Sequence, residues 1–410
     1  MRLDKSDSAG KIGPRREFIK FGSVTTLSAL TCGLSTTLAQ EIADPHPVYR
    51  IYDVIVLGLG AMGSSCLYHT AKRGAKVLGL EQFDIGHMLG SSGGFTRQTK
   101  VAPYIQGPDG ALIRRANENW RMLEKDSGQK IFHQCGWLNL GVPRNRAIAQ
   151  SKSEGTRIEL LDPREIAERY PQFHKLSNKT EALLDHDGGL LRSELSIASH
   201  CYAALRMGAH VRAQEAVQGW EADETGVTVK TSRGSYRAKH IVMASGAWNA
   251  KLVPELNGKL EVTRLSLGWF ASKDDETFEM KNFPTWGHGS HYGFPVLPDF
   301  PGIKVAKHWK GDPADPDNLD RTPNRRDESL VRNYLARHLP LANGATLAHK
   351  ICMYTWSQSW LGPLPREKRV SVITACNGGG FKFSSAYGEA LADFATEGKT
   401  ELPVGHMRKN

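Results

Sequence analysis

The chain has 410 residues, of which 40% are hydrophobic and 23% are charged. This composition excludes a disordered or fibrous protein and allows a sizeable core, and the length predicts two or three domains. Lys and Arg exceed Asp and Glu by 53 − 43 = 10. The excess is modest for this length and forms no long run, so it favours a basic surface or an anionic small-molecule substrate over nucleic acid.

The first 39 residues predict an export signal rather than the start of a fold. A basic stretch ends near the pair Arg15 and Arg16, a weakly apolar run follows, and Thr37-Leu38-Ala39 offers the small residues that a signal peptidase reads. The paired arginines resemble the twin-arginine signal of bacteria, which predicts a periplasmic or secreted protein that uses the twin-arginine export machinery. A membrane anchor or a plain basic N-terminus is the alternative.

Cysteine usage beyond the signal points neither to a disulfide framework nor to a metal site. Five cysteines remain, at positions 66, 135, 201, 352 and 376, and this set is odd in number and widely spaced. The sequence contains neither a CxxC pair nor an HExxH helix, so we expect no metal. No other stretch is long and apolar enough for a stable membrane span.

A nucleotide-binding unit follows the signal. An apolar strand over 52–57 leads into a GxGxxG turn and a helix to position 73, and a second strand covers 75–80. Gly58 allows the tight turn, Gly60 lets a pyrophosphate approach the backbone, and Gly63 lets the helix pack on the strand. The phosphates are expected at the helix N-terminus, formed by Ala61 and Met62, where free N–H groups favour anions.

The end of the second strand indicates which dinucleotide is bound. Glu81 is placed to accept hydrogen bonds from both ribose hydroxyls. An acidic residue with no Arg beside it argues against a dinucleotide that carries a 2′-phosphate. Farther along, a hairpin over 227–243 runs into Ser245-Gly246. Such a late hairpin looks like the second nucleotide-contacting region of FAD enzymes, although it could be an ordinary pair of sheet strands.

Five motifs in chain order extend this reading. They are GSSGGFTR at 90–97, DGGLLRSE at 187–194, YGFP at 292–295 with GIKVAKH at 302–308, CMYT at 352–355, and GGGFKFSS at 378–385. From Tyr52 to Leu402 the chain resembles the family of monomeric sarcosine oxidase and N-methyltryptophan oxidase, FAD-dependent enzymes that oxidise secondary amino acids. The resemblance implies a monomer that binds FAD, oxygen and a small amine or N-substituted amino acid.

The resemblance also implies an α/β fold with two domains. A Rossmann-like FAD domain of the glutathione-reductase type would take residues 50–130, 185–260 and 353–400. The substrate domain would take 131–184 and 261–352 and hold an antiparallel sheet, with strands near 261–270 and 303–309. Boundaries of this kind are loose by several residues.

Three residues receive chemical roles from the resemblance. Cys352 matches the cysteine that holds FAD through a thioether, although a buried structural cysteine is the commoner fate. Lys304 matches a lysine that assists the reaction with oxygen, and its alternative is a solvated strand lysine. Lys382 matches the lysine that binds the substrate carboxylate, and its alternative is a plain Gly-rich connection into a helix.

Other matched positions surround these three. The pocket positions, each of which could simply pack or form a hydrogen bond, are Arg97, Tyr292, His308 and Tyr354. The further cofactor-binding positions are Ser91, Thr96, Arg97, Val217, Gly246, Gly378, Gly379, Gly380 and Lys382. The glycine run at 378–380 lets backbone N–H groups come close to the flavin.

Departures from the family bear on the substrate. Gly93 and Gly379 stand where the family has histidines, and we expect Gly93 to leave space near the flavin. Lys100 stands where the family has a second carboxylate-binding arginine, and Lys cannot form a bidentate fork. The segment after Tyr354 lacks the family's acidic residue and is shorter. These changes favour a larger secondary or tertiary amine over sarcosine itself.

By resemblance, the amine is oxidised to an imine that hydrolyses, and oxygen reoxidises the flavin and yields hydrogen peroxide. One alternative is a periplasmic FAD dehydrogenase or demethylase that passes electrons to another acceptor. Another is an exported flavin-binding protein with a degenerate site, which the departures at Gly93 and Lys100 would explain.

The export signal yields a first prediction. Replacing Arg15 and Arg16 together with Lys should trap the precursor in the cytoplasm, because twin-arginine transport requires that pair. Fractionation followed by immunoblotting measures the result, with the wild-type N-terminus expected near Gln40. Unchanged export of the double variant would contradict the twin-arginine assignment.

Overall fold

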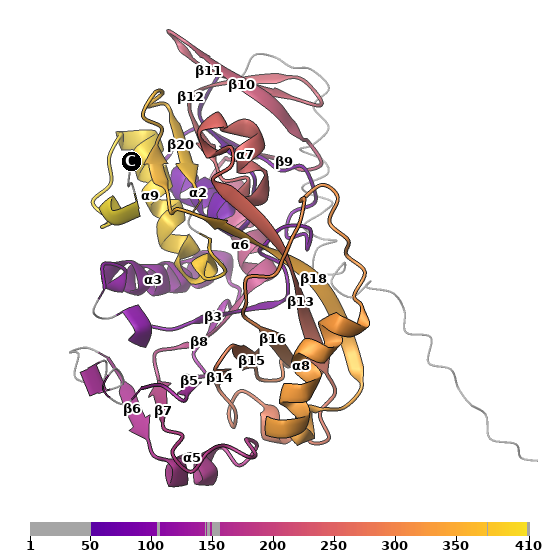
Figure 1. The fold of residues 1–410 in the computed structure, drawn as a ribbon. Helices are drawn as coiled ribbons and strands as arrows, with labels where there is room; N and C mark the ends of the chain where they lie inside the picture. The colour runs from indigo at the N-terminus through magenta and orange to yellow at the C-terminus, as the bar shows by residue number, and fades with distance from the viewer. Residues whose placement is uncertain are drawn as a thin grey trace, which may run out of the picture. The chain divides into compact units, whose positions relative to one another are not determined.

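The computed structural model of the protein describes residues 51–104, 107–143, 145, 148–149, 156–374 and 376–407. The expected export signal at 1–39 and the expected start near Gln40 lie outside these residues. Within them the chain forms three sheets with helices packed against them, and Figure 1 shows β12 and β20 among the upper elements and β13 and β16 among the lower ones.

The first sheet collects strands from distant parts of the chain. Its order is β10 (Val217–Asp223), β11 (Gly226–Thr231), β12 (Ser235–Met243), β1 (Ile51–Leu57), β2 (Val77–Leu80) and β9 (His210–Arg212), with β20 (Val370–Ile373) beside β12 and β19 (Leu361–Pro363) beside β20. Strand β1 pairs in parallel with both β2 and β12, and β11 pairs antiparallel with β12. The predicted βαβ unit and the predicted late hairpin are therefore confirmed, and they are neighbours in one sheet.

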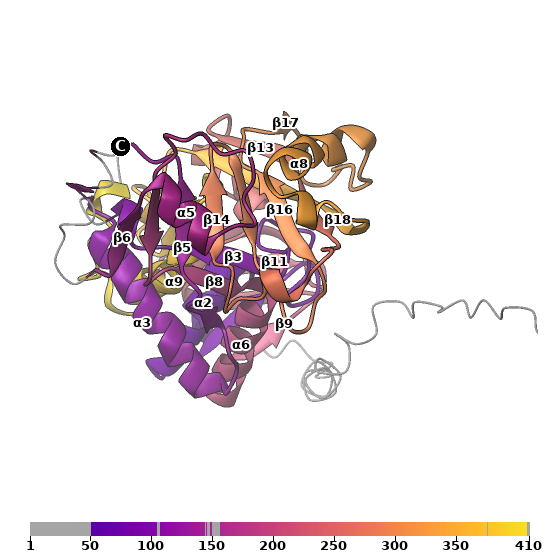
Figure 2. The ribbon, with the colours of Figure 1, turned by 90° about the horizontal axis from the view of Figure 1, so that it is seen from below.

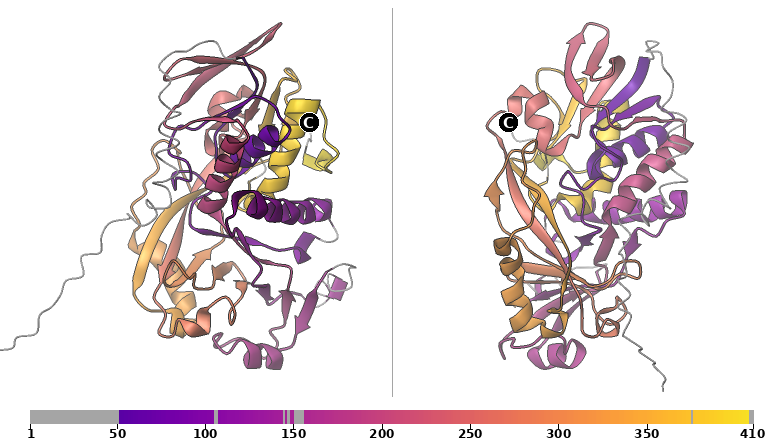
Figure 3. Two further views of the ribbon diagram at one scale, coloured as in Figure 1. Left: turned by 180° about the vertical axis from the view of Figure 1, so that it is seen from behind. Right: turned by 90° about the vertical axis from the view of Figure 1, so that its right-hand side faces the viewer.

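Four long helices cover one face of this sheet. They are α2 (Ala61–Lys72), α3 (Gly110–Ser127), α6 (Ser193–Arg206) and α9 (Ser384–Glu397). They pack against one another, as Figure 3 shows for the indigo, purple and yellow helices. Strand β1 alternates between two cores: Val54 and Val56 join the helix side, whereas Ile55 and Leu57 join the opposite side. This period of two is what a strand buried on both faces requires.

The second sheet is mainly antiparallel. Its order is β17 (Asp312–Pro313), β13 (Leu260–Phe270), β16 (Ile303–Lys307), β15 (His291–Phe294), β14 (Thr285–His288), β5 (Trp137–Leu140), β7 (Ala182–Asp185) and β6 (Ile158–Leu161). The long strand β18 (Thr346–Ser357) pairs antiparallel with β13 along its whole length. Helix α8 (Arg325–His338) packs on β13 and β16, as Figure 2 shows, and α5 (Pro163–Arg169) follows β6.

The remaining elements are short. A third sheet has the order β3 (Thr96–Thr99), β8 (Gly189–Arg192), β4 (Phe132–His133). Helix α7 (Asn249–Leu252) and seven 3-10 helices complete the described residues: η1 (Ala102–Tyr104), η2 (Gly246–Trp248), η3 (Pro254–Leu256), η4 (Glu276–Phe278), η5 (Pro340–Ala342), η6 (Gly380–Phe383) and η7 (Gly405–Met407). The domain boundaries expected from the sequence stay a prediction, and strand β18 crosses the one placed at 352/353.

Three further findings concern the described residues only. None of their helices combines the length and apolar character that a bilayer span needs. No group of three or more His, Cys, Asp or Glu in this part of the chain is arranged to hold a metal ion. The five cysteines it contains are free thiols.

Helices α2 and α9 are in close contact at Gly388. A Cβ atom at this position would lie 2.3 Å from Ser65 Oγ and 2.6 Å from the backbone nitrogen of Cys66. Backbone cannot move aside as a flexible side-chain end can, so a methyl group has no room there.

Gly388→Ala should therefore lower the free energy of unfolding by about 1–3 kcal/mol, although Ala is the better helix former. Denaturant unfolding followed by circular dichroism measures the change. The control is Gly219→Ala in β10, where no atom lies within 4 Å of the added Cβ. Its effect should stay within about 0.5 kcal/mol. Equal stability of the two variants would show that α2 and α9 are not packed this tightly.

Candidate functional site

The turn after β1 presents a helix N-terminus. Gly58 has φ +86°, and a Cβ at Gly63 would lie only 1.8 Å from the Gly58 oxygen, so this packing requires glycine. Gly60 caps α2 without any side-chain hydrogen bond, and no acidic residue stands in the first turn. The Ala61 N–H donates to Ser92 Oγ at 3.2 Å. A helix start without an acidic partner is suited to an anion.

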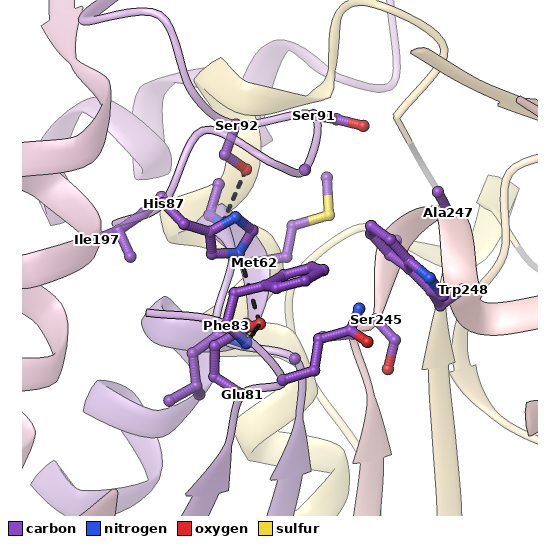
Figure 4. Close-up of a pocket in the computed structure, with 18 of the residues that line it drawn as sticks. Met62, Glu81, Phe83, His87, Ser91, Ser92, Ile197, Ser245, Ala247 and Trp248 are labelled. Carbon is purple, nitrogen blue, oxygen red and sulfur yellow. Dashed lines mark hydrogen bonds and ion pairs between the residues drawn. The ribbon is translucent and has the colours of Figure 1, made fainter. Parts of the chain in front are cut away.

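Glu81 lies beside this turn, at the end of β2. Its side chain is 5% exposed and accepts hydrogen bonds from the N–H groups of Leu59 at 2.8 Å and Phe83 at 3.0 Å. His87 Nε2 lies 3.5 Å from Glu81 Oε1, the pair joined by a dashed line in Figure 4. Burial alone would raise the pKa of Glu81, but the hydrogen bonds from His87 and the two amides outweigh it and hold the pKa below its usual value. Glu81 is therefore an anion that can accept hydrogen bonds from hydroxyl groups.

A first cavity opens between this turn, Glu81 and the end of β12. Its empty volume is about 1230 Å³, open solvent at its mouth included. Eight residues expected from the sequence to bind a cofactor line it: Gly58, Gly60, Ala61, Met62, Glu81, Ser91, Val217 and Gly246. Gly63, which was also expected to bind the cofactor, is not among the described lining residues and packs against Gly58 in the turn. Figure 4 shows the Phe83 ring between His87 and Trp248 on opposite sides of the cavity.

A second cavity adjoins the first, and Ser91, Cys376 and Phe381 line both. Its empty volume is about 1040 Å³, open solvent included. Thirteen residues that the resemblance assigned to the flavin or the substrate line it: Ser91, Thr96, Arg97, Lys100, Tyr292, Lys304, His308, Cys352, Tyr354, Gly378, Gly379, Gly380 and Lys382. The two cavities adjoin, with nucleotide-type features in the first and titratable side chains in the second.

The second cavity is strongly cationic. Among the described residues that line it, Arg97, Lys100, Lys304 and Lys382 carry positive charge, and none is Asp or Glu. Clefts lined by one sign of charge attract ligands of the opposite sign. The arrangement predicts anionic groups in this cavity.

Lys304 is buried, with only 2% of its surface exposed. Its ammonium group donates to the oxygens of Gly94 at 2.6 Å and Thr96 at 2.8 Å, and it lies 4.7 Å from the centre of the Phe294 ring. Burial lowers the pKa of Lys304 far below its ordinary value, and nearby Arg97 lowers it further. Lys304 is therefore not the solvated strand lysine that the sequence left open as an alternative. Its side chain lines the second cavity.

Arg97 connects the loop before β3 to the cavity wall. Its guanidinium donates to the oxygens of Ser91 at 3.0 Å and Gly93 at 2.5 Å. It also lies 4.0 Å from Cys352 Sγ. Burial raises the pKa of the Cys352 thiol, while Arg97 and Lys304 oppose that rise. Both chain neighbours of Cys352, Ile351 and Met353, are buried apolar residues, so these two cations favour its thiolate against the cost of burial.

The carboxylate-binding candidates gather around His308. Lys382 is 6% exposed and donates to the Gly379 oxygen at 2.5 Å, and Lys100 Nζ lies 4.0 Å from the centre of the Trp137 ring. Burial lowers the pKa of His308, and Lys100 and Lys382 lower it further, so His308 is neutral at pH 7. His308 Nδ1 lies 3.4 Å from the Tyr354 hydroxyl.

One expectation about space is wrong. Gly93 was expected to leave room near the flavin, but a Cβ there would lie 2.8 Å from Met88 Cα. The backbone of Met88 occupies that space, and its position could not be foreseen from the sequence. At Gly379, by contrast, an added Cβ would meet only Lys382 Nζ, at 3.5 Å, so this position is open.

Comparison with known proteins agrees with this geometry. Residues 53–394 match the family model described as FAD dependent oxidoreductase. The chain belongs to the FAD-dependent oxidoreductase family. It is 34% identical to monomeric sarcosine oxidase of Streptomyces avermitilis over 86% of this chain and 96% of that protein. It is 30% identical to N-methyl-L-tryptophan oxidase of Yersinia pestis over 86% of this chain and 97% of that protein.

Solved structures agree on the fold. The open form of NikD, an amino acid oxidase essential for nikkomycin biosynthesis, has a TM-score of 0.78 and 25% identity over 88% of this chain and 98% of its own. L-Proline dehydrogenase from P. horikoshii, with a TM-score of 0.76 and 21% identity over 87% of this chain and 96% of its own, shares the fold. The protein is thus an FAD-dependent oxidoreductase of the sarcosine oxidase type that acts on C–N bonds.

The residues present fit FAD. The start of α2 offers N–H groups to a pyrophosphate, Glu81 is an anion beside it, and the joined cavities have room for both a nucleotide and a flavin. Sequence reasoning missed several lining residues: Phe83, His87, Ser92, Glu215, Trp248, Lys251, Cys376 and Phe381. Ser92 could have been found from the Ser91-Ser92 pair, and Phe381 from its place between Gly380 and Lys382.

Proposed function

We propose that this enzyme oxidises an N-alkyl amino acid that is a secondary or tertiary amine. The C–N bond becomes an imine that water hydrolyses, so one amine, one oxygen and one water give a dealkylated amine, a carbonyl compound and hydrogen peroxide. The observation that carries the proposal is the lining of the second cavity, whose described residues include Arg97, Lys100, Lys304 and Lys382 but no Asp or Glu. Monomeric sarcosine oxidase and N-methyl-L-tryptophan oxidase, its relatives, are named for N-methyl amino acids.

When bound, FAD supplies the redox chemistry by accepting a hydride equivalent from the amine and passing electrons to oxygen. The residues of the chain supply position and charge. Lys382 and Lys100, which line the second cavity together with His308, bind the substrate carboxylate. Open space at Gly379 admits substituents larger than those of sarcosine.

Lys304 assists the oxygen half of the reaction. A buried cation stabilises negative charge that develops on oxygen as it is reduced. Its protonated form is required for this effect, and its lowered pKa places the loss of that proton at a lower pH than for an ordinary lysine. Arg97 holds the loop around Ser91 and Gly93 against the cavity.

We further propose that FAD is attached covalently to Cys352. The thiol lines the second cavity, and Arg97 and Lys304 favour its thiolate against the cost of burial. Export by the twin-arginine route to the periplasm is proposed from Arg15 and Arg16 alone. That route carries folded proteins, so FAD would be loaded in the cytoplasm.

The function is tested by mixing the purified enzyme with a panel of N-alkyl amino acids and their decarboxylated amines. Anaerobic bleaching of the flavin by N-alkyl amino acids, with peroxide formed once air is admitted, is the expected result. Bleaching without oxygen uptake, together with fast dye reduction, would instead favour a dehydrogenase that uses another acceptor.

Lys304→Met should slow flavin reoxidation by oxygen roughly a thousandfold, equivalent to about 4 kcal/mol, with much less effect on flavin reduction. The wild-type reoxidation rate should fall as pH rises through the lowered pKa of Lys304, and the variant should lose this pH dependence. Stopped-flow absorbance measures both half-reactions, with Lys307→Met in the same strand as the control. A parallel loss of both half-reactions and of bound flavin would assign Lys304 a purely structural role.

Lys382→Met should discriminate between substrates. An amino-acid substrate should lose about 2–4 kcal/mol of transition-state stabilisation, measured from kcat/KM, whereas its decarboxylated analogue should lose little. Lys350→Met, which removes a charge from an exposed position of β18, is the matched control. Equal losses for both substrates would show that Lys382 does not read a carboxylate.

The yellow colour of the flavin should stay with the polypeptide after acid precipitation, because a thioether between FAD and Cys352 survives that treatment. Cys352→Ser should bind FAD only reversibly, whereas Cys376→Ser, which removes the other thiol of the second cavity, should keep the bound colour. Absorbance of the pellet and of the supernatant measures the result. Flavin in the wild-type supernatant would return Cys352 to a structural role.

A further inference from the structure

A connecting segment between β17 and α8 lies outside both cavities but is bound to their walls. We call residues 314–324 the strap. It contains Asp315, Asp317 and Asp320 together with two prolines. In Figure 1 this orange connection rises ahead of α8 toward the elements of the first sheet.

The first anchor of the strap is Asp317. Its carboxylate accepts a hydrogen bond from Trp248 Nε1 at 2.6 Å and forms an ion pair with Lys251. Both Trp248 and Lys251 line the first cavity, in which the start of α2 and Glu81 would hold FAD. One rim of the cofactor cavity is thus tied to the strap.

The second anchor is Arg321, four residues farther along. Its guanidinium donates to the Leu89 oxygen at 2.6 Å. Leu89 directly precedes Gly90, Ser91 and Ser92, which line the same cavity. Figure 4 shows Ser92 and His87 on the side of the cavity opposite Trp248, so the two anchors hold different rims.

The strap between these anchors is well ordered. Leu319 packs with Ala247, Val262 and Met353. Arg264 of β13 donates to the oxygens of Asp320 and Thr322, each at 3.0 Å. Four residues can span at most about 14 Å, so while both anchors are made the two rims cannot move far apart.

Each anchor is weak when taken alone. Asp317 and Lys251 have side chains 49% and 51% exposed, and surface ion pairs of this kind contribute little each. The Arg321 bond is a single charge-assisted hydrogen bond to a carbonyl. None of the residues in these anchors belongs to a strand of either sheet.

We propose that the strap is a gate for FAD: with Asp317 and Arg321 anchored it holds the rims of the cofactor cavity together, and release of either anchor lets FAD enter or leave. A gate has a distinctive kinetic signature. It slows entry and exit equally, so removing it raises both rates and leaves the Kd nearly constant. Loss of a direct cofactor contact raises only the rate of exit.

The test measures FAD exchange in a Cys352→Ser background, so that no covalent link holds the flavin. Flavin fluorescence follows uptake by the apoprotein and release from the FAD-loaded protein. Asp317→Ala and Arg321→Ala should each raise both rates about tenfold, and the Kd should change less than threefold. Arg321→Lys, which keeps one donor, should restore most of the wild-type rates.

Asp320→Ala is the matched control, because it removes the same charge from the strap at a residue whose carboxylate accepts from Thr322 within the strap. It should leave both rates unchanged. Raising the salt concentration should speed exchange in the Cys352→Ser parent but not in the Asp317→Ala variant, since salt screens the exposed ion pair.

A rise in the release rate alone, or equal effects of Asp317→Ala and Asp320→Ala, would overturn the gate. None of these measurements uses an amine substrate or oxygen. The gate can therefore fail while the proposed reaction stands, and the reverse is equally possible.

Discussion

The site depends on the backbone of residues 94–96, which is held by the carboxylate of Glu194 and by the side-chain nitrogen of Lys304. The N–H groups of Gly94 and Phe95 donate to the carboxylate of Glu194 in α6, at 2.5 and 2.8 Å. The oxygens of Gly94 and Thr96 accept from the buried ammonium of Lys304 in β16. One stretch thereby joins the helices of the first sheet to the second sheet. Because a buried charge that loses its partner is costly, this junction has little freedom to shift.

Sequence reasoning was reliable where function follows from local spacing. The turn around Gly58, the helix start and Glu81 lie within one βαβ unit, so their order along the chain fixes their geometry. The second cavity was predicted through the family resemblance, since strands from several parts of the chain meet there. Phe83 and Trp248 were missed because no pattern links positions so far apart. Gly93 was misjudged because its neighbour Met88 belongs to a loop without a regular period.

Division of the site into two adjoining cavities separates two tasks. The first cavity holds nucleotide-binding features, and the second holds every titratable residue of the proposed chemistry, with only Ser91, Cys376 and Phe381 common to both. Substitutions at positions such as Lys100 or Gly379 can alter the choice of substrate and leave the walls around Glu81 untouched.

Strand β18 also carries information about folding. Cys352 and Tyr354 are two residues apart, so they share one face of the strand, and both line the second cavity. Antiparallel pairing with β13 sets that face, with Cys352 opposite Leu265 and Tyr354 opposite Thr263. A slip of one residue would turn both side chains away together. The flavin attachment proposed for Cys352 would then mark only chains in which β13 and β18 had paired in the native register, and colour would distinguish correctly folded molecules from misfolded ones.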